Sequence, residues 1–184
     1  DVHIELPMVP MSLSAAQQDG QLHTVLLRER REPTFFRAWK KRHVCIVGHK
    51  LLMFRENALA GDLAVEAVSL LDVKGHLTKE PVHGVKHVIV FEWTEESGRI
   101  ATEKPILIGC DTSDEKMRWV RGIKAGQRVG HIMLAKIRAK RKAQAAMARA
   151  EKRAEETARL VREKLGFDKD NEGESGGGTP SSSP

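Results

Sequence analysis

Three basic residues have the types and the spacing to bind an acidic group. Arg28 ends the apolar run LHTVLLR, and Lys40 and Arg42 stand one residue apart in WKKRHVCIV. Alternate residues of a strand share a face, so Lys40 and Arg42 point the same way as Val44 and Ile46. If these apolar side chains line an interior, the two cations lie where it opens to water. The charges then either form a socket for an acidic ligand or simply solvate the end of a strand.

The segment between these residues, ERREPTFFRA, adds both charge and aromatic surface. Arg30, Arg31 and Arg37 extend the positive field, and Phe35 and Phe36 are adjacent aromatic residues. Near a membrane each basic residue attracts anionic lipid by about 1 kcal/mol, and aromatic side chains favour the interface. The combination is typical of a loop that dips into a membrane. The alternative is that both phenylalanines extend the next strand and pack on its neighbours.

The composition excludes several classes of protein. The chain has 184 residues, of which 40% are hydrophobic, and no apolar run approaches the length of a membrane span. The N-terminus lacks the order of a secretory signal, so we expect a cytoplasmic protein with one folded core. Cys45 and Cys110 each lie within an alternating apolar run, which favours two reduced core thiols.

Neither catalysis nor metal binding is predicted. The sequence has no phosphate-binding glycine loop with lysine, no nucleophile elbow and no catalytic cysteine signature, so we predict no enzyme and no cofactor. His83 and His87 have a suggestive spacing, but VIVF follows directly and places His87 in a strand. Four strand residues span about 13 Å, which is too far for one metal ion.

Positive charge is concentrated near the C-terminus. The formal net charge is +6, and residues 131–165 hold eleven Lys or Arg and four Glu, which leaves −1 for the rest. Changes in composition divide the chain into a leader (1–20), a folded domain (21–126), a long basic, alanine-rich helix (131–166) and a disordered polar tail (167–184). Gly126 and Gly130 mark a hinge, unless the closing helix of the domain runs straight through them.

Short apolar runs between turn residues predict six or seven strands in the folded domain. The runs cover residues 22–28, 39–47, 50–55, 64–73, 86–93, perhaps 98–102, and 105–110. The Gly48-His49 pair fits a tight hairpin. Ser113 is expected to cap a helix whose first turn carries Asp114 and Glu115. Met117, Val120, Ile123 and, less surely, Trp119 give this helix an apolar face.

These residues make the sequence resemble the pleckstrin homology (PH) family over about residues 21–126. The strongest points are WKKRHVCIV, KLLMFRE and DEKMRWVRGIKAG, which match the second strand, the third strand and the closing helix of the family. The resemblance implies a mainly β fold, a seven-stranded antiparallel barrel or sandwich capped by a C-terminal helix. Trp119 would be the family's helix tryptophan and would fill the core.

The resemblance also implies a ligand. Members that bind phosphoinositides use a basic residue late in strand one, then a basic residue, any residue and an arginine in strand two, a pattern that Arg28, Lys40 and Arg42 fit. The third-strand tyrosine of several members is replaced here by Leu52 or Met53. Because many members bind proteins instead, two functions stay open. One is a non-catalytic membrane-targeting adaptor for signalling, and the other is a protein-interaction scaffold.

The long basic helix is compatible with several partners. At 1.5 Å per residue it would reach about 50 Å. It can lie on anionic membrane and strengthen a weak headgroup site, as a peripheral contact, or it can dock on a cytoskeletal or trafficking protein. A plain spacer is the third alternative. Nucleic acid is the least favoured partner, because no aromatic residues are interleaved with the charge for base stacking.

Overall fold

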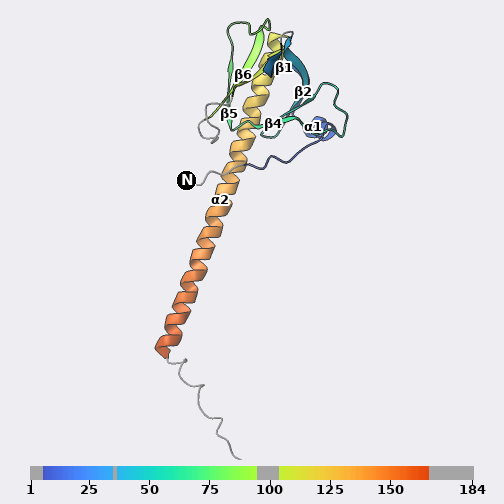
Figure 1. The fold of residues 1–184 in the computed structure, drawn as a ribbon. Coiled ribbons are helices and arrows are strands. Elements are labelled where there is room, and N and C mark those ends of the chain that lie inside the picture. Colours follow the sequence, from blue (N-terminus) through green and yellow to red (C-terminus); the bar gives the residue numbers. More distant parts are fainter. Residues whose placement is uncertain (1–5, 35–36, 95–103, 166–184) are drawn as a thin grey trace, which may run out of the picture. The chain divides into compact units, whose positions relative to one another are not determined.

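The computed structural model describes residues 6–34, 37–94 and 104–165 of the chain. Figure 1 shows a β domain followed by a long helix. The elements in chain order are α1 (Leu13–Asp19), β1 (Leu22–Thr34), β2 (Arg37–Val47), β3 (Lys50–Arg55), β4 (Glu66–Ser69), β5 (Val73–Leu77), β6 (His87–Trp93), β7 (Ile106–Cys110) and α2 (Ser113–Leu165).

The seven strands form one antiparallel, curled sheet, which confirms the predicted PH-like class. Its order is β4-β3-β2-β1-β7-β6-β5. Two meanders, β1–β4 and β5–β7, are therefore joined where β1 pairs with β7. One face of the sheet, here called the inner face, carries the main core together with Trp119 and Ile123 of α2; its sheet members include Leu26, Val44, Ile46, Met53, Val68, Phe91 and Ile108.

The predicted strands agree with the structure except in two places. Strand β1 continues to Thr34, beyond its predicted end at Arg28, and β2 begins at Arg37 instead of Trp39. Residues 64–73 were expected to form one strand, but β4 ends at Ser69, and β5, from Val73 to Leu77, lies almost entirely beyond the predicted range. The expected strand at 98–102 lies outside the described residues. The β2–β3 hairpin has the predicted two-residue turn, with Val47 paired to Lys50. Gly48 has a φ of 59°, which glycine adopts without steric cost.

The N-terminal segment covers the other side of the sheet, here called the outer face. Ser12 caps α1 by accepting a hydrogen bond from the Ala15 backbone, and the buried Leu13 and Ala16 face the strands. They form a second core with outer-face residues of β2 and β3, namely Cys45, Val47, Leu52 and Phe54. The region read from sequence as a surface leader thus contributes buried apolar side chains to the domain.

Helix α2 begins with a cap one residue earlier than predicted. The Thr112 hydroxyl accepts a hydrogen bond from the Glu115 backbone nitrogen at 3.1 Å, so Thr112 takes the role expected of Ser113. The Glu115 carboxylate accepts a hydrogen bond from the backbone of Asp111 at 3.0 Å, which secures the start of the helix. Met117 is 44% exposed, so it does not belong to the apolar face, whereas Trp119 is 1% exposed and does.

Helix α2 runs straight through Gly126 and Gly130, which are packing positions. Gly122, Gly126 and Gly130 recur every four residues and thus share one helix face. A Cβ at Gly126 would lie 2.5 Å from Leu70 Cδ1 and 2.8 Å from the Gly48 carbonyl oxygen. The glycines therefore let α2 lie close against the sheet over these turns. The Gln127 side chain adds hydrogen bonds to the carbonyls of Leu70 and Val73.

We expect Gly126→Ala to destabilise the domain, although alanine normally stabilises a helix. Overpacking costs about 1–3 kcal/mol, and the gain in helix propensity returns about 1 kcal/mol, so a net loss of about 1 kcal/mol is expected. Urea denaturation measures it. Gly61→Ala is the control, because a Cβ there meets nothing within 4 Å. A Gly126→Ala protein more stable than wild type would contradict the close packing.

The chain divides into two compact units, Asp1–Lys136 and Ile137–Pro184. The first holds the sheet, α1 and the part of α2 that packs on the inner face. In the second, every helical residue from Arg138 to Leu165 is exposed. Over the ranges that the structure describes, neither helix combines the length and the apolar character of a bilayer span.

Candidate functional site

The predicted cations project from the inner face at one end of the core. In the β1–β2 ladder Arg28 lies opposite Lys40, and Leu26 lies opposite Arg42, so these side chains lie on the same side of the sheet. Arg42 in turn pairs with Arg55 of β3. The apolar inner face thus ends in a group of cations from three neighbouring strands. We call these residues, with Glu66, the charged end: Arg28, Lys40, Arg42, Arg55 and Glu66.

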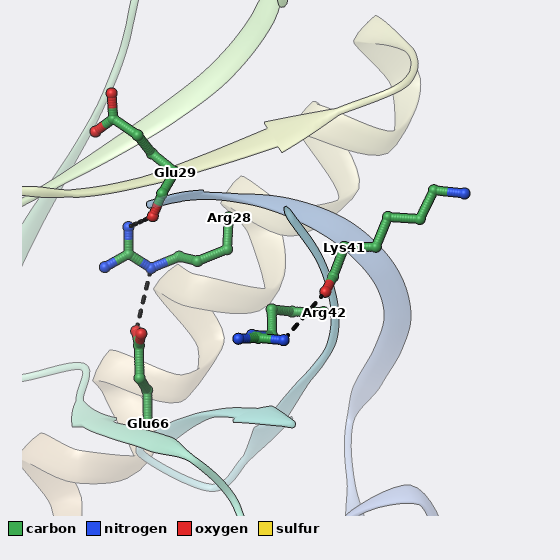
Figure 2. Close-up of polar contacts among 5 residues, drawn as sticks. All are labelled: Arg28, Glu29, Lys41, Arg42 and Glu66. Carbon is green, nitrogen blue, oxygen red and sulfur yellow. Dashed lines mark hydrogen bonds and ion pairs between the residues drawn. The ribbon is translucent and has the colours of Figure 1, made fainter. Parts of the chain in front are cut away.

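Arg28 is the most deeply buried cation of the charged end, and its charge is neutralised inside the protein. Its side chain is only 2% exposed, and its Nε lies 3.1 Å from Oε2 of Glu66. Its Nη1 also donates a hydrogen bond of 2.8 Å to the carbonyl oxygen of Glu29. Figure 2 shows the guanidinium held between these two oxygen atoms. A buried charge is costly unless it is paired and hydrogen-bonded, and these two acceptors meet that requirement for Arg28.

The Arg28–Glu66 pair crosses the inner face. Arg28 belongs to β1 and Glu66 to β4, and β2 and β3 lie between them in the sheet. Such a reach is possible because the sheet curls and because the arginine side chain is long. Glu66 retains 19% exposure and so lies at the boundary between the core and water.

Lys40, Arg42 and Arg55 lie nearer to solvent than Arg28. Lys40 and Arg42 are half-buried and Arg55 is exposed. Arg42 Nη1 lies 3.5 Å from the Lys41 carbonyl oxygen, a contact drawn in Figure 2. Three cations on adjacent strands can together bind a multiply charged anion such as a phosphate group. Arg55 and Glu66 were not among the predicted site residues.

Lys41 is a cation next to the charged end that does not belong to it. It lies between Lys40 and Arg42 in the chain but on the outer face, because side chains alternate along a strand. Its Nζ lies 4.0 Å from Glu56, and both side chains are 61% exposed. Such a pair contributes little to stability.

Most of the segment predicted as a membrane-dipping loop is strand: the backbone belongs to β1 up to Thr34 and to β2 from Arg37. Phe35 and Phe36 are outside the described residues. Arg30, Arg31 and Arg37 belong to β1 and β2 by their backbone, and their side chains lie outside the described part. Thr34 and Arg37 pair across the turn between the two strands, so the strands extend well beyond the charged end.

Two histidines form a separate polar group on the outer face. The rings of His23 and His43 stack with centroids 5.5 Å apart, and Nε2 of His23 lies 3.2 Å from Nδ1 of His43. Burial, and secondly the charge of His43, lower the pKa of His23. Burial also lowers the pKa of His49, with a smaller effect from Lys50. None of these rings belongs to the charged end.

Both cysteines are free and buried, as the sequence predicted. Burial raises the pKa of the Cys45 thiol to about 11. Burial, with smaller effects from Glu115 and Asp111, raises that of Cys110 to about 12. Thiols with such pKa values are neutral and unreactive at pH 7. Over the described part of the chain, no three metal-ligating side chains gather in one place.

Comparison with known proteins gives one family match. The family model described as "PH domain" matches residues 17–128. The match therefore covers all seven strands and the first turns of α2. A search of curated proteins found no match.

Several solved structures have a similar fold. The C-terminal PH domain of pleckstrin is 15% identical, with a TM-score of 0.44 over 58% of this chain and 94% of that one. The same domain bound to an inositol pentakisphosphate is 14% identical, with a TM-score of 0.43 over 59% of this chain and 95% of that one. The Slm1 PH domain in complex with phosphoserine is 13% identical, with a TM-score of 0.45 over 60% of this chain and 98% of that one.

Proposed function

Because the chain belongs to the PH domain family, we propose that it is a non-catalytic targeting module that binds acidic phospholipid headgroups at the charged end. The supporting observation is that Lys40 and Arg42 of β2 and Arg55 of β3 extend from the same face of the sheet at the end of the core. Phosphoinositide headgroups carry the multiple phosphates that such a group of cations favours. The protein then attaches to membranes peripherally.

Within this proposal the predicted residues have different roles. Lys40 and Arg42, joined by Arg55, contact the phosphates directly. Arg28 lies behind them, buried and paired with Glu66. Arg30, Arg31 and Arg37 contribute long-range attraction, and Phe35 and Phe36 enter the interface of the lipid layer.

Charge reversal tests the site. We expect the Lys40→Glu, Arg42→Glu double variant to bind phosphoinositide vesicles about 1,000-fold more weakly, because each reversal removes about 1 kcal/mol of attraction and adds similar repulsion. Co-sedimentation of the full chain with phosphatidylcholine vesicles that contain a phosphatidylinositol bisphosphate measures it.

Lys41→Glu is the matched control for that experiment. It makes the same change of charge as each single site substitution, on the same strand and between the two site residues, but on the outer face. We expect it to retain nearly all binding. If Lys41→Glu lost half as much binding free energy as the double variant, net charge and not the site would attract the lipid, and the proposed site would be wrong.

A second candidate function rests on the exposure of the second unit. Its basic helix, from Arg138 to Leu165, leaves every residue open to solvent and can dock on an acidic protein of the cytoskeleton or of a trafficking complex. Glutamine substitutions at five cations separate the candidates, namely Lys136, Arg138, Lys140, Arg141 and Lys142. Loss of a protein partner with unchanged vesicle binding favours the scaffold function.

A further inference from the structure

The charged end contains an acidic residue, Glu66, among its cations. Glu66 brings a carboxylate to the cations from β4, and its Oε2 accepts a hydrogen bond of 3.1 Å from Arg28 Nε. The second contact of the Arg28 guanidinium is a backbone carbonyl, which carries no net charge. Glu66 is thus the acidic group that holds the most buried cation of the site.

The position of Glu66 allows exchange with a ligand. It pairs with Met53, two residues before Arg55 on β3, and it keeps 19% exposure. A phosphate held by Arg42 and Arg55 would therefore approach the same guanidinium from the solvent side. Two anions cannot share that region without strong repulsion, because their charges interact over a few ångströms in a partly dry site.

We propose that Glu66 competes with the anionic ligand for Arg28 and so sets the affinity of the site. Binding exchanges one ion pair for another: the carboxylate leaves Arg28, and a phosphate oxygen takes its place. Such a site is weak unless the ligand carries enough charge to displace the carboxylate. The inference rests on the proposed function and identifies the residue that tunes it.

Glu66→Gln tests the competition, since it keeps the shape of the side chain and removes its charge. We expect the variant to bind about tenfold more tightly than wild type. Two probes are used with the full chain: vesicles that contain a phosphatidylinositol bisphosphate, and soluble inositol trisphosphate. Tighter binding of both identifies the headgroup as the ligand, and tighter binding of vesicles alone identifies the membrane surface. Either result supports the competition.

Two further variants separate competition from loosened packing. Glu66→Asp keeps the charge, so its affinity should stay close to wild type; a gain equal to that of Glu66→Gln would overturn the proposal. In the Arg28→Met, Glu66→Gln double variant the freed cation is absent, so the gain should disappear. A gain that persists there would show that Arg28 is not the contested group. Circular dichroism confirms that each variant is folded.

The outcomes distinguish this inference from the function on which it rests. If wild type binds through Lys40 and Arg42 but Glu66→Gln binds no better, the competition is wrong and the proposed function stands. If neither wild type nor Glu66→Gln binds either probe, both are wrong. Binding by Glu66→Gln alone would show a site that Glu66 keeps closed.

Discussion

Trp119→Ala is expected to lower the free energy of unfolding by about 3–5 kcal/mol, because it leaves a large cavity in the main core. The side chain is 1% exposed and packs among residues of the sheet and Ile123. A domain of this size is stable by about 5–15 kcal/mol, so the loss removes a large share. Urea denaturation followed by circular dichroism measures it.

Two variants on the same helix serve as controls for Trp119→Ala. Met117→Ala changes a 44% exposed residue and should shift stability by less than about 0.5 kcal/mol. Trp119→Phe should cost less than the alanine variant, since the indole Nε1 has no hydrogen-bond partner among the described residues and phenylalanine removes that donor. A loss below that of Met117→Ala would contradict the core position of Trp119.

Arg28→Ala is expected to lower the free energy of unfolding by about 3 kcal/mol, the lower end of the range for breaking a buried ion pair. The lower end applies because Glu66 retains 19% exposure, so water can partly solvate the carboxylate that loses its partner. The midpoint of urea denaturation at low salt measures the change. Arg55→Ala removes the same charge from an exposed position on the same face and should be nearly neutral.

Replacing both partners shows which part of that loss comes from the stranded charge. The Arg28→Met, Glu66→Leu double variant substitutes apolar side chains of similar volume, and such replacements are often neutral or stabilising. We therefore expect near wild-type stability. A double variant as unstable as Arg28→Ala would mean that the pair is needed for the curl of the sheet itself.

Much of the fold was predictable because its signals are local. Alternation of apolar residues identified the strands, and the spacing of Ile123 and its neighbours identified the closing helix. The β2–β3 hairpin also indicates which residues lie opposite one another. A two-residue turn at Gly48-His49 pairs Val47 with Lys50, and counting outward from there pairs Arg42 with Arg55. The third cation of the charged end could thus have been found from sequence.

Other parts depended on distant contacts and could not be read from the sequence. Residues 56–65 separate Glu66 from β3, so neither its register nor its approach to Arg28 follows from a local count. The burial of Arg28 and its ion pair with Glu66 could not be predicted for the same reason. Gly126 and Gly130 were predicted to mark a hinge unless the helix runs through them, because isolated glycines weaken a helix. Their four-residue spacing, extended by Gly122, was the sign of a close helix contact.

The sheet order has a consequence for the time course of folding. The strands β1 to β4 pair with near neighbours in the chain, and so do β5 to β7. Among the described residues, the two groups pair where Leu27 and Arg28 lie opposite Gly109 and Ile108. Bringing these distant residues together closes a long loop, which slows the search. During synthesis the first hairpins can form early, yet the sheet joins only after β7 has left the ribosome.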